Sequence, residues 1–378
     1  MLQLIVKAKR LNKRKVIPAF LPDPNNIVGV VNENFVFEGD EVGELDLPNK
    51  ALGKWYKDRD GHFYWGGGLG EKEEVLAKDF KAAVIFPWWI ENALYSIPEL
   101  WNEKSSKKVT IAILDTGINE HFDFDFSKIN GFNYLENNES YKTDGHGHGT
   151  HLAGIIAAQG KKSFGVNPTV DLFIAKVSDS SNTLSLKAVR DCLSDILNQK
   201  NGAIDIDVIN MSFQITVGID PEEIKLKQEI EDLLRKLHNN NNCILVSAVG
   251  NINRVKNFFP ASMEECISVG NINSELKRNP NSTMSPSLDI MAPGTEIVSL
   301  KGVDELGVLS GSSQSCAFVS AVCSKGIQEL KEFLLSDNKM LIKHLLHTAF
   351  NNSFPLLEYG SGIVSPNQFI KSIKTIAR

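Results

Sequence analysis

Cysteine is scarce in this chain, and its arrangement excludes two kinds of scaffold. The 378 residues include five cysteines, an odd number, and no two of them form a Cys-x-x-Cys pair. A disulfide framework would need an even set, and a structural zinc cluster would need such pairs. We therefore expect reduced thiols in a cytoplasmic protein.

Long apolar runs and a strong excess of charge of one sign are also lacking. No stretch approaches the roughly 20 apolar residues that a membrane span needs, and the N-terminal MLQLIVKAKRLNKRK has too short an apolar run for a secretory signal. The net charge is −6, and the basic cluster at residues 7–15 is local. We therefore expect no membrane and no nucleic acid among the partners.

Residues 1–70 carry strand patterns. The β-rich runs LQLIVKA, NIVGVV and NFVFEG are separated by clusters of Pro, Asn and Gly, and Asp60-Gly61 stands between two aromatic-rich runs, which indicates a hairpin. The segment GKWYKDRDGHFYWGGGL resembles the last hairpin of bacterial Src-homology-3-like barrels. The resemblance implies a small all-β barrel domain over residues 1–70, through which a protein partner would bind. The alternative is an extension of the main domain.

The pattern changes at residue 71. EKEEVLAKDFKAA is charged and compatible with a helix, and IENALYSIPELWNEK, which starts at residue 90, is amphipathic. We assign residues 71–95 to a linker and helix, and residues 96–378 to the main domain.

The main domain alternates strand and helix patterns. VTIAILD, at residues 109–115, is a nearly continuous apolar and β-branched run, as expected for a parallel strand buried on both faces. Similar runs and helix-compatible segments follow: strands DLFIAKV, IDVINMSF and CILVSAVGN, and helices THLAGIIAA, SLKAVRDCLSDILNQ and PEEIKLKQEIEDLLRKLHNN, with Asn239–Asn242 as a helix-ending loop. This alternation predicts an α/β fold with a doubly wound, mostly parallel sheet, in which ligands bind beyond the carboxyl ends of the strands.

Three polar residues occupy positions where such a fold would hold a site. Asp115 ends the first core strand, His148 begins a helix, and Ser313 follows a turn that contains Gly311. A serine hydroxyl becomes a nucleophile when a base with a pKa near 7 takes its proton, and a buried carboxylate can orient that base. The order Asp, His, Ser therefore indicates a candidate hydrolase site.

Six segments of this region resemble, in order and spacing, those of the subtilisin family of serine proteases. They are IAILDTGI, DGHGHGTHLAG, INMSF, SAVGN, LDIMAPGTEI and SGSSQSCAFVSA. The resemblance implies a subtilisin-like fold and an endopeptidase that acts on peptides or proteins. By position, Asp115 would orient the base His148, and Ser313 would be the nucleophile. The side-chain amide of Asn251 would bind the oxyanion together with the backbone N–H of Ser313.

The sequence departs from the family pattern around the nucleophile. Ser312 replaces the preferred Thr, and Gln314–Ala317 replaces a Met-Ala-Ser/Thr-Pro run. The choice between Ser312 and Ser313 as nucleophile stays open here, and the helix start lacks its usual proline. Cys316 is expected to be a small packing residue.

By the same resemblance, substrate would pair as an added strand with segments near Asn182 and after the strand IDVINM. The substrate-binding residues would be Thr183, Leu184, Ser212, Phe213, Gln214 and Gly250. Gln214 stands where the family has a glycine that lets substrate backbone approach closely. We therefore expect a narrow cleft and restricted specificity.

The loop at residues 159–168 corresponds to one that holds calcium in many relatives. It is short here and carries Lys161 and Lys162, cations that would oppose a divalent ion. We predict no metal ion at this loop and no cofactor.

Two alternative functions remain. A zinc hydrolase would use His146, His148 and His151, although Thr150 stands where the His-x-His-x-Asp-His pattern has its Asp. A catalytically silent or latent peptide-binding protein would keep the fold without turnover. In a serine protease, by contrast, His151 would be a hydrogen-bonded structural residue and His146 a loop residue near the cleft.

Overall fold

The computed structural model describes residues 107–203, 205–332, 338–351 and 353–376, the turn at Trp88 and Trp89, and the strands of an N-terminal unit. The chain divides into two compact units, Met1–Ala83 and Val84–Arg378. The helical segments predicted at residues 71–83 and 90–104 lie outside the described residues, except that Glu71 is the last residue of a strand.

The described residues of the N-terminal unit form strands, as the sequence pattern predicts. They are β1 (Leu2–Val6), β2 (Arg10–Arg14), β3 (Ile27–Asn32), β4 (Val36–Glu41), β5 (Trp55–Asp58), β6 (Phe63–Trp65) and β7 (Leu69–Glu71). Their pairings are antiparallel, in the order β3-β2-β6-β5-β4-β1-β7. The predicted hairpin is present, because Trp55 pairs with Trp65 and Tyr56 with Tyr64. Among the described strands, β3 and β7 are the two edges of the sheet, and no pairing joins them.

The second unit is an α/β domain whose seven-stranded sheet is parallel throughout, in the order β14-β13-β12-β11-β8-β10-β9. Its strands are β8 (Thr110–Asp115), β9 (Ile129–Asn133), β10 (Asp171–Lys176), β11 (Ile206–Met211), β12 (Ile244–Ala248), β13 (Cys266–Ile272) and β14 (Ile290–Pro293). A separate antiparallel hairpin is formed by β15 (Ile297–Lys301) and β16 (Glu305–Leu309). The helices are α3 (His148–Ala157), α4 (Leu186–Leu197), α5 (Pro221–Asn241), α6 (Ser312–Glu332), α7 (Asn338–His347), α8 (Leu356–Tyr359) and α9 (Pro366–Ile376), with short 3-10 turns η5 (Phe126–Lys128) and η6 (Ser140–Lys142). The predicted doubly wound α/β fold is confirmed.

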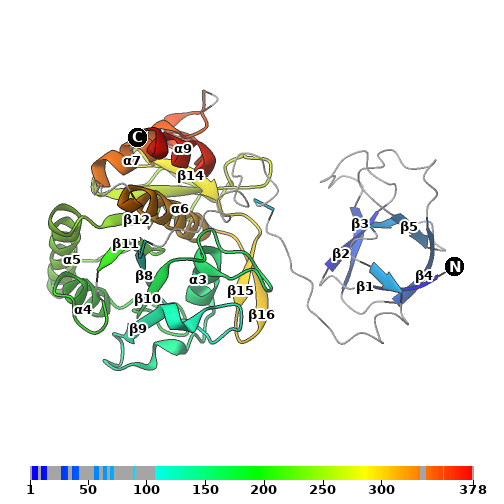
Figure 1. Cartoon of the computed structure of the whole chain (residues 1–378), viewed down its shortest axis with the longest axis horizontal. Coiled ribbons are helices and arrows are strands. Elements are labelled where there is room, and N and C mark those ends of the chain that lie inside the picture. The colour runs from blue at the N-terminus through cyan, green and yellow to red at the C-terminus, as the bar shows by residue number, and fades with distance from the viewer. Residues whose placement is uncertain are drawn as a thin grey trace. The chain divides into compact units, whose positions relative to one another are not determined.

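Apolar side chains fill both faces of this sheet, which explains the continuous apolar runs in the sequence. Along β8, Ile111 and Ile113 belong to the core beneath α3 and α6, whereas Ala112 and Leu114 belong to the core beneath α4 and α5. Figure 1 shows these two helix layers on opposite sides of the sheet.

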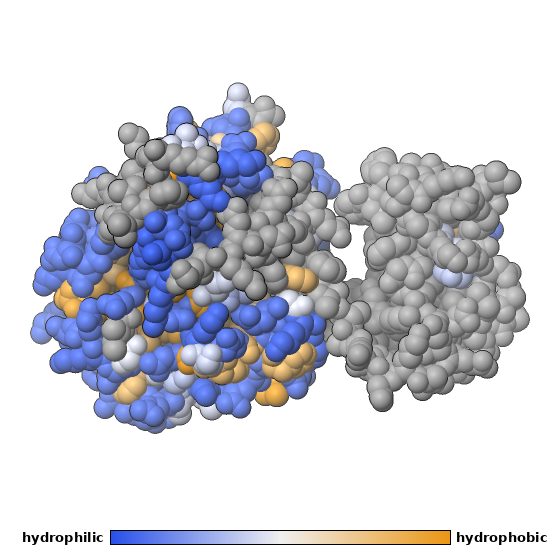
Figure 2. All heavy atoms as spheres, viewed as in Figure 1, coloured by the Kyte–Doolittle hydropathy of each residue, from blue (hydrophilic) through white to orange (hydrophobic). Residues whose placement is uncertain are grey.

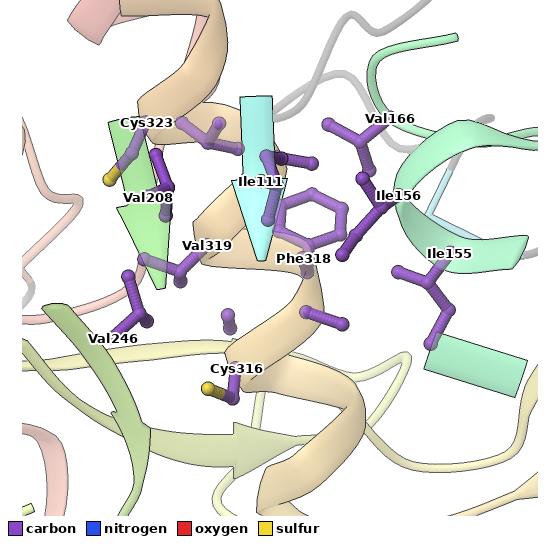
Figure 3. Close-up of a cluster of buried hydrophobic side chains, with 14 of the residues drawn as sticks. Ile111, Ile155, Ile156, Val166, Val208, Val246, Cys316, Phe318, Val319 and Cys323 are labelled. Carbon is purple, nitrogen blue, oxygen red and sulfur yellow. The ribbon is translucent and has the colours of Figure 1, made fainter. Parts of the chain in front are cut away.

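The core beneath α3 and α6 extends to a segment that the sequence assigned to a linker. Figure 3 shows Phe318 of α6 among the buried side chains of this core, with Ile111 and Ile156 around it. The ring of Trp89 packs edge-on against Phe318, with 5.3 Å between ring centroids. Trp88 donates its indole N–H to the Thr295 carbonyl at 2.9 Å. This part of the predicted 71–95 linker is therefore anchored in the second unit.

Helix ends follow local sequence signals. The side chain of Ser185 caps α4, and Asp220 caps α5 with Pro221 at the first helical position. The asparagine run at 239–242 differs from its prediction, because α5 continues through Asn241 and only Asn242, with φ of 58°, leaves the helix. Asparagine tolerates this left-handed conformation, so a single residue ends the helix.

Hydrophilic residues dominate the coloured part of the surface in Figure 2, with smaller hydrophobic areas between them. In the portion of the chain that the structure describes, no helix combines the length and the apolar composition needed to cross a bilayer.

The strand order reverses around β8. The chain runs from β8 to the edge strand β9, returns to β10 beside β8, and then continues on the other side of β8 with β11, β12, β13 and β14. At such a switch point the connections diverge and leave a crevice at the carboxyl ends of the strands. The residues that follow β8, β11 and β12 therefore meet at one place (Figure 1).

Candidate active site

Asp115 is the last residue of β8, and its carboxylate is buried among hydrogen-bond donors. Its Oδ1 atom accepts from the backbone N–H of Thr116 at 2.9 Å and contacts Nδ1 of His148 at 2.8 Å. A carboxylate that accepts at Nδ1 fixes the imidazole tautomer and leaves Nε2 free to take a proton. The structure thus brings together two of the predicted site residues, 33 positions apart in the chain.

His148 is the first residue of α3. The residue before it, Gly147, has φ of 84°, a left-handed conformation that a glycine adopts without strain. Burial alone would lower the pKa of His148, but the charge and hydrogen bond of Asp115, together with the charge of Asp144, reverse this effect and raise the pKa. The site therefore favours the imidazolium that forms when the base takes a proton.

Ser313 lies in the first turn of α6 and is 7% exposed. Its Oγ donates to the Ser212 carbonyl at 3.2 Å, while Ser212 Oγ donates to the Ser313 carbonyl at 3.1 Å. Within the described residues no hydrogen bond joins Ser313 Oγ to His148. If Ser313 is the nucleophile, its hydroxyl must turn away from the Ser212 carbonyl before a base can take its proton.

Ser312 occupies a different environment from Ser313. It is fully buried, and its Oγ accepts from the backbone N–H of Gly250 at 3.2 Å. Its own N–H donates to Oδ1 of Asn251 at 2.8 Å. These contacts give Ser312 a structural role between the two chain segments and favour Ser313 as the nucleophile.

Asn251 follows β12 and faces the start of α6. Because its Oδ1 accepts from the Ser312 N–H, the Nδ2 group is the one left for a ligand, and no acceptor for it is recorded among the described residues. The Ser313 N–H belongs to the first turn of α6, where backbone N–H groups lack intrahelical partners. Two donors are thus available beside the Ser313 hydroxyl.

The start of α6 is fixed without the family's proline. Ser315 Oγ donates to the Ala292 carbonyl at 2.9 Å. Gly311 donates its N–H to the Gly294 carbonyl at 2.8 Å, and a Cβ on Gly294 would meet Ser315 Oγ at 2.1 Å. Cys316 is buried in the core, which agrees with the predicted packing role. Side-chain hydrogen bonds and a close backbone approach therefore hold the helix end that carries Ser313.

The two predicted substrate segments flank the carboxyl end of β8, because β8 lies between β10 and β11. In the first segment, the N–H of Thr183 donates to Asp179 Oδ1 and its carbonyl accepts from the Asp179 N–H. Leu184 lies opposite Ser178 in an antiparallel bridge. The hydrogen bonds of this bridge are made by the residues on either side, so the N–H and C=O of Leu184 itself point away from Ser178. Leu184 can therefore pair with a peptide, whereas the backbone of Thr183 is already engaged.

The second segment follows β11. Phe213 and Gln214 are half-buried there, and Ile215 then bonds to the Phe259 carbonyl. Across the site, the ring of Phe258 lies against Gly250: a Cβ on Gly250, where φ is 113°, would meet two ring carbons at 2.9 and 3.0 Å. Lys256 Nζ lies 4.5 Å from the centroid of this ring. The sequence did not predict Phe258 as a site residue, because no local motif indicates a contact between an aromatic ring and a glycine eight positions earlier.

The three neighbouring histidines have separate partners. His151 is fully buried, and its Nε2 donates to the carbonyls of Ile297 at 3.1 Å and Gly307 at 3.3 Å. Burial lowers the pKa of His151 to about 3, so this ring stays neutral. His146 is exposed, with 6.0 Å between its ring centroid and that of His148. The predicted structural role of His151 is confirmed.

These partners argue against the zinc alternative. Nε2 of His151 donates to two carbonyls, which leaves only its fully buried Nδ1 as a possible metal ligand on that ring. In the described part of the chain no group of three or more His, Cys, Asp or Glu side chains is arranged to hold a metal ion.

The loop at residues 159–168 is organised around the buried carboxylate of Asp123. Its oxygens accept from the backbone N–H groups of Lys161, Lys162 and Ser163, each at 2.8 Å. The ammonium of Lys162 lies 5.0 Å from the ring centroid of Phe122. Both oxygens of Asp123, which could otherwise bind a cation, therefore accept hydrogen bonds from the loop backbone.

Comparison with known proteins agrees with this geometry. The model of the subtilase family matches residues 106–362. The thermostable alkaline protease of Halalkalibacterium halodurans is 30% identical over 256 residues, which is 67% of this chain and 65% of that protein. Subtilisin DY of Bacillus licheniformis is 28% identical over 284 residues, 72% of this chain and 96% of that protein. The major intracellular serine protease of Bacillus subtilis is 30% identical over 237 residues, 59% of this chain and 70% of that protein. The chain belongs to the subtilase family and is a subtilisin-like serine endopeptidase.

Proposed function

We propose that this endopeptidase hydrolyses peptide bonds through Ser313, His148 and Asp115, with Asn251 and the Ser313 N–H as oxyanion donors. The observation that carries the proposal is the buried 2.8 Å contact between Asp115 Oδ1 and His148 Nδ1, together with the place of Ser313 in the first turn of α6. A carboxylate, an imidazole and a hydroxyl at one switch point are the groups that acyl transfer needs.

The chemistry follows from these groups. Ser313 Oγ attacks the peptide carbonyl as His148 Nε2 takes its proton, and the resulting oxyanion accepts from Asn251 Nδ2 and the Ser313 N–H. His148 then returns the proton to the amine as the C–N bond breaks. Water attacks the acyl-enzyme ester with His148 again as base, which releases the acid and regenerates the serine. Asp115 keeps its charge throughout and stabilises the imidazolium.

A fluorophosphonate probe tests this assignment on the full chain. We expect one labelled residue, mapped to Ser313 by mass spectrometry of the digest, and peptide hydrolysis that is unchanged by a chelator. A serine activated by a base is the group that such a probe modifies. Loss of hydrolysis with the chelator and no label would indicate the zinc alternative. Absence of both label and hydrolysis would indicate a silent or latent peptide-binding protein.

We further propose that the cleft accepts a small side chain at the residue whose carbonyl is attacked. Gly250 adjoins Asn251, and the ring of Phe258 fills the space beside its Cα. Gln214, half-buried on the facing segment, adds bulk where the family has a glycine. A large side chain placed between these segments would meet the Phe258 ring, which supports the restricted specificity expected from the sequence.

A peptide-library cleavage profile is expected to favour small residues at this position, and Phe258→Ala is expected to raise cleavage after aromatic residues by about tenfold or more, since pocket volume discriminates on that scale. The matched control is Phe122→Ala, because Phe122 is 45% exposed and packs against His121 and Lys162, not against Gly250. It should leave the profile unchanged. A wild-type enzyme that cleaves readily after large aromatic residues would contradict this proposal.

For residues 1–70 we propose a Src-homology-3-like barrel that binds a protein partner, joined by residues 71–95, of which Trp88 and Trp89 pack in the second unit, to a peptidase domain at 96–378. The antiparallel sheet and the β5–β6 hairpin, with Trp55 and Tyr64 buried, support this proposal. We also propose a cytoplasmic location. It is supported by the relative named as intracellular and by the free, buried state of the five cysteines.

A further inference from the structure

A second buried carboxylate lies behind the candidate base. Asp144 is 4% exposed and precedes α3 by four residues, on the opposite side of Gly147 from His148 in the chain. The sequence comparison gave it no role, since only Asp115 matched a catalytic position. Its contacts indicate a function of its own.

Five donors converge on the two oxygens of Asp144. Oδ1 accepts from the N–H of Gly147 at 2.7 Å, from Oγ1 of Thr116 at 2.8 Å and from the N–H of His146 at 3.2 Å. Oδ2 accepts from the N–H of Thr150 at 2.8 Å and from its Oγ1 at 2.6 Å. An asparagine side chain could not replace this carboxylate. It has only one acceptor oxygen, and its NH₂ group would face N–H or O–H groups that also donate.

The same contacts join the strand that carries Asp115 to the helix that carries His148. Thr116, which follows Asp115, donates to Asp144 and accepts from the N–H of Gly149 at 2.9 Å. Thr150, in the first turn of α3, donates to Asp144 and accepts from the N–H of Asn119 at 2.9 Å. Residues on both sides of His148 are therefore held against the end of β8 through one carboxylate.

We infer that Asp144 is a positioning residue that sets the distance and orientation between Asp115 and His148 and adds negative charge behind the imidazole. The inference rests on the proposed triad. The carboxylate of Asp144 bonds to Thr116, His146, Gly147 and Thr150, so its effect on His148 passes through the first turn of α3 and through its charge.

Several charged or titratable groups face His148. Asp115 contacts it directly from β8, His146 lies beside it in the preceding loop, and His151 follows one turn later in α3. From β15, the aliphatic part of Lys301 packs against Gly147. Burial lowers the pKa of His148, and the charges of Asp115 and Asp144 raise it. Removing the Asp144 charge therefore leaves a base with a lower pKa.

The test compares Asp144→Asn with the wild-type full chain in peptide hydrolysis across pH. We expect kcat to fall by about 10- to 100-fold from misplacement of the base, with KM little changed. We also expect the acid limb of kcat/KM to move to lower pH, because His148 acts only when neutral and its imidazolium has lost a nearby negative charge. A loss of folding stability alone would not move this limb.

Two further variants separate charge from position. Thr150→Val keeps the Asp144 charge and removes a tether, so we expect a lower kcat with an acid limb close to that of the wild type. Asp123→Asn is the matched control, because Asp123 is equally buried and accepts from three backbone N–H groups outside the site. It should lower the melting temperature and leave the pH profile in place.

The outcomes distinguish a wrong inference about Asp144 from a wrong assignment of the triad. An active, fluorophosphonate-labelled wild type with an Asp144→Asn enzyme of unchanged kcat and pH profile would overturn this inference alone. If Asp144→Asn does not fold, unchanged kcat in Thr150→Val would overturn it. A wild type without label at Ser313 would instead overturn the proposed triad.

Discussion

Alanine at Ser313 is expected to lower kcat for peptide hydrolysis by about 10⁶-fold, the loss that removal of the triad serine causes in subtilisin. Without Oγ no acyl-enzyme can form, whereas the oxyanion donors Asn251 Nδ2 and the residue-313 N–H remain. The side chain lost is one hydroxyl with a single acceptor, the Ser212 carbonyl. Folding should therefore change little, and circular dichroism with a thermal melt checks this alongside the kinetics.

Ser312→Ala is the control for that variant. It removes the acceptor of the Gly250 N–H, a buried hydrogen bond whose loss costs about 1–3 kcal/mol of stability. The nucleophile stays, so we expect fluorophosphonate labelling to persist and kcat/KM to fall by less than about tenfold. Labelling that survives in Ser313→Ala and disappears in Ser312→Ala would reverse the assignment of the two serines.

The parallel core of the fold could be predicted because each strand is an apolar run buried on both faces. Ile111 and Ile113 enter one core while Ala112 and Leu114 enter the other, and this burial leaves no polar alternation in the sequence. The hairpin of the N-terminal unit could be predicted from Asp60-Gly61 for a similarly local reason. The anchoring of Trp89 could not, since its partner Phe318 lies more than 200 residues later.

In the candidate site, too, residues within local motifs could be predicted, whereas contacts between distant residues could not. Motifs at the end of β8 and at the starts of α3 and α6 predicted Asp115, His148 and Ser313 as site residues, and the folded chain joins Asp115 to His148. Asp144 was visible in DGHGHGTH, but its five donors include the distant hydroxyl of Thr116, which only the folded chain brings close. The engagement of Thr183 by Asp179 and the contact of Phe258 with Gly250 likewise depend on loop conformation, which residue type alone does not determine.

Replacement of His148 by alanine is expected to abolish measurable turnover, with a loss of about 10⁶-fold in kcat, as removal of the triad histidine causes in subtilisin. The Ser313 hydroxyl would then have no base, and the buried Asp115 carboxylate would lose its 2.8 Å partner. An uncompensated buried carboxylate also costs stability. Initial rates with a fluorogenic peptide and the rate of fluorophosphonate labelling measure the catalytic loss, and a thermal melt measures the second effect.

His146→Ala is the control for His148→Ala, because His146 lies beside the proposed base without being one. The His146 side chain is exposed, and its recorded hydrogen bond to Asp144 uses the backbone N–H, which alanine retains. We therefore expect most of the turnover and the labelling rate to remain. A metal site built on the three histidines would lose activity in both variants, and also in His151→Ala. Equal inactivation of His146→Ala and His148→Ala would thus contradict the assignment of His148 as the single base, because only His148 is held by Asp115 at the end of β8.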